Sequence, residues 1–200
     1  MTVDSSPFER RGLRERKRVA TRERVFDAAM AEFCRVGFEN AVISDIARSA
    51  GVSRPSFYAH FPTREHVLYE ALWRSSLEVV RRLEGSDDLQ GTLERLAEAL
   101  IAAEESVGNP ALYREMLGIF ARRPPDLDLD TPIPVFEVIN ERFREARDRG
   151  ELRAGLDPEQ AAVLCLSGVF GYLLGVDATS DERRKDLRTL FGLFLADKAT

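Results

Sequence analysis

The chain has 200 residues, of which 44% are hydrophobic and 32% are charged, proportions typical of a globular domain. Its formal net charge of -5 argues against a protein that binds polyanions over its whole surface. The longest nearly apolar run, residues 161–176, is shorter than the roughly 20 residues that span a bilayer. The arginine-rich N-terminus lacks the apolar block of a secretory signal. We therefore expect a cytoplasmic protein with no membrane partner.

The charge is unevenly distributed along the chain. Residues 1–64 contain 12 Lys/Arg against 8 Asp/Glu, whereas the remaining residues contain 17 against 26. A basic N-terminal segment followed by an acidic remainder is typical of a nucleic-acid-binding module joined to a second domain. Cys34 and Cys165 each lie in an apolar helical pattern, which predicts two buried thiols rather than a disulfide.

Apolar residues recur every three or four positions throughout, and no segment alternates as a strand would. The pattern predicts an all-α fold of about nine helices, with Thr63 as the expected N-cap of the fourth. Their expected ranges are 19–36, 43–50, 54–61, 64–84, 89–107, 110–122, 132–149, 158–176 and 180–197. The expected domains are a flexible basic arm (1–18), a helix-turn-helix domain (19–66) and a helical ligand-binding and dimerisation domain (67–200).

The two short helices around Gly51 have the pattern of a helix-turn-helix. Glycine permits the tight turn, and apolar residues on both sides can pack the helices together. The expected packing residues are Ile46, Ala47, Ala50, Val52, Phe57 and Phe61. The same pattern would also fit an ordinary turn between two helices of a bundle.

The wider sequence distinguishes these alternatives. Residues 43–65 read ISDIARSAGVSRPSFYAHFPTRE and follow VFDAAMAEFCRVGFENAV. Over about residues 19–70 the chain closely resembles the DNA-binding domain of TetR-type transcriptional regulators. The matching positions are Ile46-Ala47, Ala50 to Ser53, Phe57-Tyr58, His60-Phe61 and Thr63 to Glu65. The resemblance implies a three-helix DNA-binding head on a helical body, acting as a ligand-controlled repressor that binds a palindromic operator as a dimer.

Five residues are expected to contact the DNA backbone. By their positions in the resembled motif, Tyr58, His60 and Arg64 would contact phosphates, and the hydroxyls of Ser44 and Ser53 would add hydrogen bonds. The family usually has lysine where Arg64 stands, and arginine keeps the charge. The family usually has threonine where Val42 stands, and valine can neither cap the second helix nor bind a phosphate.

Base reading is expected from the start of the third helix. Arg54 and Ser56 would meet base edges, and Pro55 would offer an apolar contact to a thymine methyl group. Because proline disfavours a helical backbone at the preceding residue, two starts of the third helix remain open: at Arg54, or one residue later with Arg54 at its cap and Ser53 outside.

Basic residues also precede the first apolar helix. They are Arg10, Arg11, Arg14, Arg16, Lys17, Arg18 and Arg22, interleaved with Glu9 and Glu15. Two interpretations remain open: a disordered solvated tail, or an arm that follows the DNA backbone or enters the minor groove.

The last two helices are expected to form a homodimer interface, as the resemblance implies. Residues 161–176 are apolar on nearly every side, and their glycines would permit close approach of another helix. The expected interface residues are Leu164, Gly168, Gly171, Tyr172, Gly175, Leu187, Leu190, Phe191 and Phe194, with Leu195 on the same predicted stripe. The alternative is that the same residues form the core of a single chain.

The resemblance also implies a pocket for an apolar effector of unknown identity. The candidate lining is Trp73, Leu77, Tyr113, Met116, Leu117, Phe120, Phe136, Ile139 and Phe143, although each could be an ordinary core residue. No cofactor or metal is expected, since neither His60 nor His66 has other ligands at a suitable spacing. The acidic run Asp126, Asp128 and Asp130 lacks the glycine and distal glutamate of an EF-hand.

The sequence also bears on two other function classes. An enzyme has little support, because the chain lacks a glycine-rich phosphate loop, a nucleophile elbow and a metal cluster. A dimeric small-molecule-binding or scaffold protein without specific DNA binding is the stronger alternative, because of Val42 and the mixed charge of the head.

Overall fold

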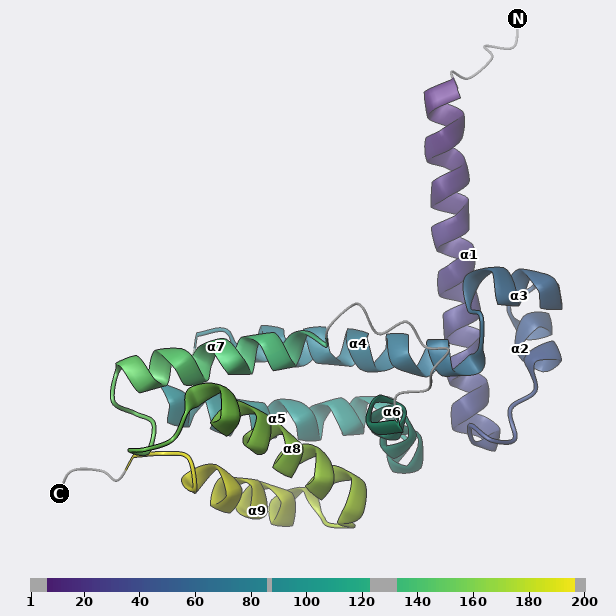
Figure 1. Ribbon diagram of the computed structural model, residues 1–200. Coiled ribbons are helices and arrows are strands. Elements are labelled where there is room, and N and C mark those ends of the chain that lie inside the picture. Colours follow the sequence, from purple (N-terminus) through teal and green to yellow (C-terminus); the bar gives the residue numbers. More distant parts are fainter. Residues whose placement is uncertain (1–6, 86–87, 123–132, 197–200) are drawn as a thin grey trace, which may run out of the picture. The chain divides into compact units, whose positions relative to one another are not determined.

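The computed structural model describes residues 7–85, 88–122 and 133–196. Within these ranges the chain forms nine α-helices and divides into two compact units, residues 1–68 and 69–200 (Figure 1). The division lies within the fourth helix. This confirms the all-α prediction, and no described helix is long and apolar enough to cross a membrane.

The first unit contains α1 (Pro7–Val36), α2 (Ile43–Ser49), α3 (Arg54–His60) and the start of α4 (Arg64–Leu83). The helices α1, α2 and α3 contact one another pairwise. Their common core includes Val25, Ala29, Ile46, Phe57 and Phe61, all of which are fully buried. The predicted packing of the two short helices onto the first is therefore confirmed, with Val52 half-buried beside them.

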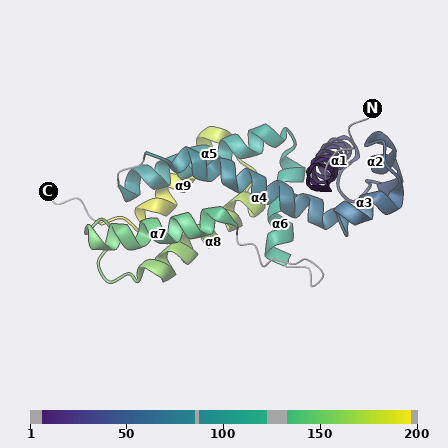
Figure 2. The same ribbon diagram turned by 90° about the horizontal axis from the view of Figure 1, so that it is seen from above.

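The prediction for residues 7–18 was wrong, because these residues continue α1 rather than forming a flexible arm (Figure 1; Figure 2 shows the same helix end-on). The segment is rich in arginine and glutamate, which are good helix formers. Pro7 stands in the first turn, where its missing N–H costs nothing. Farther along, the Glu15 carboxylate accepts from the Arg18 guanidinium at 3.2 Å, one helical turn away.

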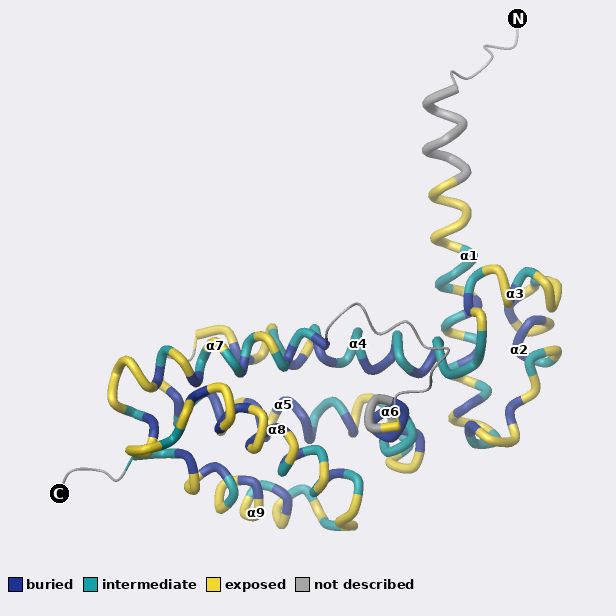
Figure 3. The backbone as a smooth tube through the Cα atoms, viewed as in Figure 1, coloured by how far each residue is buried: buried dark blue, intermediate teal, exposed yellow. Residues whose placement is uncertain are grey.

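The second unit holds the rest of α4 and five further helices. They are α5 (Leu89–Val107), α6 (Pro110–Arg122), α7 (Pro134–Asp148), α8 (Pro158–Gly175) and α9 (Ser180–Gly192). Helix α7 packs on α8, α5 packs on α9, and α6 contacts both α5 and α8. The buried sides of these helices face one another, as the dark segments of Figure 3 show.

Helix α7 begins at Pro134 and is anchored to α4. Its first turn has no capping side chain at Ile133. Instead, the backbone N–H of Val135 donates to the buried Ser76 hydroxyl of α4 at 2.9 Å. A hydrogen bond between helices therefore replaces the local cap.

The last helix is five residues shorter than predicted. It ends at Gly192, whose carbonyl accepts from the Arg153 guanidinium at 3.0 Å. Beyond it, Leu195 forms an isolated antiparallel bridge with Leu152. The hydrogen bond from the Arg153 N–H to the Phe194 carbonyl, at 2.8 Å, is a tertiary contact that sequence periodicity does not reveal. Phe194 and Leu195 consequently lie outside α9.

The two thiols differ in their surroundings. Cys165 is buried, as predicted, and burial raises its pKa to about 12. Cys34 is exposed on α1, so the prediction that it is buried was wrong. The face of α1 that packs on α2 and α3 is narrower than the apolar pattern indicated.

Candidate functional site

The structure decides which residue caps helix α3. It begins at Arg54, and the Ser53 side chain accepts from the Ser56 N–H as the N-cap. Pro55 occupies the first turn, where no backbone donor is lost. Of the two starts that the sequence left open, the structure has the one at Arg54, because an extended Ser53 before a first-turn proline is a favourable helix entry.

The turn between α2 and α3 depends on Gly51, whose φ is +66°. This left-handed conformation is accessible to glycine without steric cost. The Val52 N–H donates to the Ala47 carbonyl at 2.9 Å, which closes the turn. The spacing of the helix-turn-helix is thus fixed by backbone geometry.

One side of α3 faces the core and the other faces solvent. Phe57 is fully buried, and its ring centroid lies 6.2 Å from that of Phe61. Tyr58 is 40% exposed, and Arg54 is exposed beside it with its guanidinium 5.7 Å from the Tyr58 ring centroid. The Arg54 guanidinium also donates to the Tyr58 hydroxyl at 3.4 Å. These two side chains form the accessible edge of the helix.

The remaining candidates lie around this edge with varied exposure. Ser44, Ser53 and Pro55 are exposed, whereas Ser56 and His60 are half-buried. The pKa of His60 is lowered by partial burial and by the nearby charges of Arg22 and Arg18. Its imidazole is therefore neutral at pH 7 and can donate one hydrogen bond.

The Arg64 guanidinium, which was expected to contact a phosphate, already binds acceptors within the head. One guanidinium nitrogen donates to the carbonyls of Phe38 at 2.9 Å and of Glu39 at 3.0 Å. Another donates to the Glu39 carboxylate at 2.8 Å, and the group lies 4.5 Å from the Phe38 ring centroid. The Arg64 side chain thus ties the start of α4 to the turn after α1.

Sequence reasoning also assigned Arg22 to the arm, whereas the structure places it inside the head. Its guanidinium lies 4.0 Å from the Phe61 ring centroid and donates to the His60 carbonyl. The spacing of Arg22 to Val25 and Ala29, at i+3 and i+7, was the signal that it shares the inner face of α1. Arg22 therefore fixes the C-terminal end of α3.

Val42 occupies the N-cap position of α2 with an extended backbone. It makes no side-chain cap, as expected from its lack of a hydroxyl, and it is 51% exposed. The helix N-terminus therefore presents an apolar side chain where a threonine would offer a hydrogen bond.

The candidate effector residues lie mostly in the core of the second unit. Tyr113, Met116, Leu117, Ile139 and Phe143 are buried, and burial raises the pKa of the Tyr113 phenol. Trp73, Leu77 and Phe136 are half-buried, and the Phe120 side chain lies outside the described residues, as do Asp126, Asp128 and Asp130. None of them lines any of three hollows found among the described residues. The buried Trp73 indole N–H has no hydrogen-bond partner there.

The candidate interface residues separate into two groups. Leu187, Phe191 and Phe194 are buried within the chain and have little surface for a partner. Gly168 permits close packing within the chain, since a Cβ there would come within 3.1 Å of the Leu190 side chain. Within a single chain these residues therefore belong to the core, which is the alternative that the sequence left open.

The other group leaves one side of α8 open. Leu164 is 61% exposed, and within the described part of the chain Gly171 and Gly175 have no neighbouring atoms where a Cβ would stand. Tyr172 is half-buried, and its hydroxyl donates to Asp186 at 2.9 Å. Val163 lies next to Leu164 and is also exposed, so apolar and small residues share this face.

Comparison with known proteins identifies the head. The sequence model of the family described as "Bacterial regulatory proteins, tetR family" matches residues 25–71. An uncharacterized HTH-type transcriptional regulator YdgC of Bacillus subtilis is 34% identical, covering 78% of this chain and 80% of YdgC. The HTH-type transcriptional regulator UidR of Escherichia coli K12 is 22% identical over 86% of this chain and 91% of UidR.

The fold is similar to that of solved family members. The structure of the repressor FadR of Thermus thermophilus, in complex with lauroyl-CoA, superposes with a TM-score of 0.63 at 24% identity. The match covers 86% of this chain and 92% of FadR. Together with the exposed edge of α3, these similarities show that the chain belongs to the tetR family of bacterial regulatory proteins and is a helix-turn-helix transcriptional regulator.

Proposed function

We propose that the chain binds a palindromic DNA operator as a homodimer, represses transcription from it, and is released by a small apolar effector. The observation that carries the proposal is the division of α3 into a buried side at Phe57 and an exposed edge at Arg54 and Tyr58. A helix that is anchored on one side and polar on the other can enter the major groove without losing its packing. The protein would act in the cytoplasm, where bacterial DNA is found.

Backbone contacts and base contacts come from different residues of the site. Tyr58 and neutral His60 would donate to phosphates, with Ser44 and Ser53 adding hydroxyl contacts. Such bonds set the register of the protein on the duplex but carry little sequence information. Arg64, whose donors already have protein acceptors, would hold the head in shape beside the phosphates.

Sequence preference would come from the first turn of α3. Arg54 is exposed at the N-terminal end of the helix, where side chains of a recognition helix meet base edges. Its planar guanidinium can bind a guanine through two hydrogen bonds. Ser56 and Pro55 would add a hydroxyl and an apolar contact on the same turn.

The N-terminal part of α1 would add affinity that depends on salt. Arg16, Lys17 and Arg18 lie on its exposed turns, and Arg10, Arg11 and Arg14 precede them in the sequence. A helical arm presents these charges at fixed spacing, unlike a flexible tail. Contacts of this kind release counterions, so deletion of residues 1–17 should flatten the dependence of affinity on salt.

The open face of α8 would form the dimer interface. Leu164, Val163, Gly171 and Gly175 lie on one side of the helix, and no described residue of the same chain covers the two glycines. Exposed apolar side chains next to small residues favour close packing of two helices. Leu190 and Tyr172 would border this surface, and the buried Leu187, Phe191 and Phe194 would support it from within.

The effector would bind among the inner helices of the second unit. Trp73, Leu77 and Phe136 are half-buried there, and the unpartnered Trp73 indole N–H could donate to an acceptor on the ligand. The lauroyl-CoA complex of FadR supports an effector with a substantial apolar part. Such a ligand must bind the released state more tightly than the DNA-bound state. We propose no enzymatic activity for the chain.

The experiment is a fluorescence binding titration with duplex DNA from beside the protein's own gene, at several salt concentrations. We expect tight, salt-sensitive binding to one palindromic segment, with two chains bound per duplex. Tyr58→Phe should weaken binding to all DNA sequences about equally. If no duplex is preferred over random DNA at low salt, the protein is a small-molecule-binding or scaffold protein of the same fold.

A further inference from the structure

The last turn of α3 is bound to α1 through an arginine side chain. The Arg22 guanidinium donates to the His60 carbonyl, 38 residues away in sequence, and lies 4.0 Å from the centroid of the Phe61 ring. The Phe61 side chain is fully buried, and its ring centroid lies 6.4 Å from that of Phe26, which is also on α1. A hydrogen bond and two ring contacts therefore join the C-terminal end of α3 to α1.

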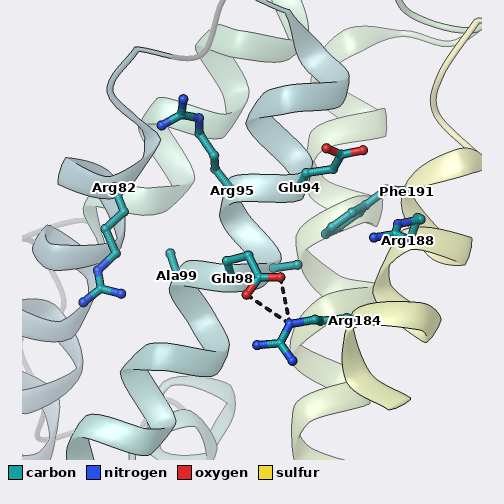
Figure 4. A pocket seen from close by; sticks show the side chains of 9 residues that line it. Arg82, Glu94, Arg95, Glu98, Ala99, Arg184, Arg188 and Phe191 are labelled. Carbon is teal, nitrogen blue, oxygen red and sulfur yellow. Dashed lines mark hydrogen bonds and ion pairs between the residues drawn. The ribbon is translucent and has the colours of Figure 1, made fainter. Parts of the chain in front are cut away.

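The hydrogen bond of Arg22 differs from the ion pairs of the second unit. Arg184, beside a hollow of about 290 Å³, donates through Nε to both carboxylate oxygens of Glu98, at 2.8 and 3.1 Å, as the dashed lines in Figure 4 show. Ion pairs between two long, partly exposed side chains contribute little to stability. The acceptor of Arg22 is instead a backbone carbonyl at the end of a helix. Such carbonyls have no partner within the helix, and the helix dipole favours a cation beside them.

Helix α3 depends on contacts with its neighbours because it is short. It has seven residues, fewer than the roughly 12–15 that an isolated helix needs in water. The Ser53 cap fixes its first turn, and the buried Phe57 anchors its middle. The direction of the last turn is therefore set by the contacts that Arg22 and Phe61 make.

The last turn carries the side chains that are expected at the DNA backbone. Tyr58 is exposed there, and His60 is half-buried. Arg54, the expected base-reading residue, lies six positions before His60, which is about 9 Å along a helix that rises 1.5 Å per residue. A displacement of the last turn would thus move the phosphate contacts more than the base contact.

Arg22 also acts on the His60 imidazole. Partial burial lowers the pKa of His60, and the positive charges of Arg22 and Arg18 lower it further. The Arg22 guanidinium is therefore close enough to influence the imidazole while it binds the carbonyl of the same residue. Titration of the imidazole consequently reports whether this arginine is in place.

We propose that Arg22 is a positioning residue for DNA binding, which holds the last turn of α3 so that Tyr58 and His60 meet phosphates. This inference rests on the proposed function. Arg22 needs no contact of its own with DNA in this role, because it acts through the His60 carbonyl and the Phe61 ring. A guanidinium suits the position, since it is planar and can lie on a ring while it donates to a carbonyl. A lysine would keep the charge but lose the planar contact.

Fluorescence titrations of the full chain with its preferred duplex, at several salt concentrations, test the proposal. They compare the wild type, Arg22→Gln, His60→Gln and the double variant. We expect Arg22→Gln to weaken binding to all duplexes about tenfold, because a hydrogen bond to a charged group is lost. The slope of log affinity against log salt should stay the same, whereas loss of a direct phosphate contact would reduce it by about 0.9. The loss in the double variant should be smaller than the product of the two single losses, because Arg22 acts partly through His60.

NMR titration of His60 in the protein without DNA gives a second readout. In Arg22→Gln the midpoint should rise toward 6.5. In Arg22→Lys it should stay below that of Arg22→Gln, because the positive charge remains, and part of the DNA affinity should be recovered.

Two variants control for the loss of charge. Arg24 lies two residues along α1 and donates to the Ala50 carbonyl, at the end of α2, at 3.4 Å. Arg24→Gln should leave the His60 midpoint unchanged. Arg184→Gln removes the same charge from the second unit and should leave DNA affinity unchanged.

Three outcomes would each overturn the proposal while the wild type still prefers one duplex: an unchanged His60 midpoint in Arg22→Gln, a double-variant loss equal to the product of the single losses, or a reduced salt slope. The proposed function then stands. A wild type that prefers no duplex overturns both, before any variant is compared. Urea denaturation shows whether each variant is folded in the titration. If Arg22→Gln is not, Arg22→Lys takes its place in the same cycle and should show a smaller loss that again falls below the product.

Discussion

The guanidinium of Arg64, at the start of α4, lies 4.5 Å from the centroid of the Phe38 ring and donates to the Phe38 carbonyl at 2.9 Å. The same group also binds the carbonyl and carboxylate of Glu39. A single side chain thus satisfies the backbone of the turn that joins α1 to α2. The residue expected to contact DNA holds the DNA-binding head together.

Replacing Arg64 with alanine should lower the free energy of unfolding by about 1–3 kcal/mol, because the Phe38 and Glu39 carbonyls lose their donor. Urea denaturation measures the change. Arg48→Ala is the matched control, since Arg48 is exposed on α2 and, among the described residues, pairs only with Asp45 on the same helix. Equal stability of the two variants would contradict the structural role.

Arg54→Ala should relax the base preference at one position of the operator by roughly 1–3 kcal/mol, because a bidentate contact would be lost. Binding titrations against a set of single-base operator variants measure this change. Arg35→Ala removes the same charge from the end of α1, where Arg35 pairs with Glu32, and should preserve the preference at every position. An unchanged preference in Arg54→Ala would remove this residue from base reading.

Val42→Thr should stabilise the head by about 1 kcal/mol, because a hydroxyl at the N-cap can accept from the first turn of α2. It should also raise DNA affinity if that hydroxyl meets a phosphate. Val19→Thr is the control, since Val19 has a similar exposure but lies inside α1, where no cap is needed. Thermal denaturation should show a higher midpoint temperature for Val42→Thr alone. A similar increase for Val19→Thr would refute the capping argument.

His60 should make the native state less stable in mild acid. Its pKa lies below the ordinary 6.5 because of partial burial and the charges of Arg22 and Arg18. Well above pH 6.5 the imidazole is neutral in both states, so the free energy of unfolding does not depend on it there. Below pH 6.5 the unfolded chain binds the proton more readily, so the free energy of unfolding falls.

NMR titration of the imidazole measures this directly, with His60→Gln used to assign the resonance. The midpoint should lie below 6.5, and the variant should lose less stability than the wild type between pH 7 and pH 5.5. A midpoint at or above 6.5 would show that the arginines do not act on His60.

Leu164→Glu should convert the proposed dimer into a monomer of 22.5 kDa, since a carboxylate would be placed on the open apolar face of α8. Sedimentation equilibrium measures the mass. Val19→Glu places the same charge at a similarly exposed valine of the head and should remain dimeric. A monomeric wild type at the working concentration would contradict the dimer itself.

The sequence by itself determined the nine-helix fold and the position of the helix-turn-helix. These follow from short-range rules: apolar spacing sets the buried face of each helix, and Gly51 permits the turn. Phe57 and Phe61 could be assigned to the core for the same reason. The family resemblance then selected the exposed side of α3 as the DNA-binding edge.

Only the tertiary structure decided which polar and small residues are already occupied within the chain. The guanidinium groups of Arg64 and Arg22 donate to backbone carbonyls that are distant in sequence. The Leu190 side chain occupies the space beside Gly168. Helix α9 ends at Gly192, whose carbonyl accepts from Arg153. Long side chains have many accessible conformations, and their partners come from other helices. Their roles therefore depend on how the helices pack, which local periodicity does not encode.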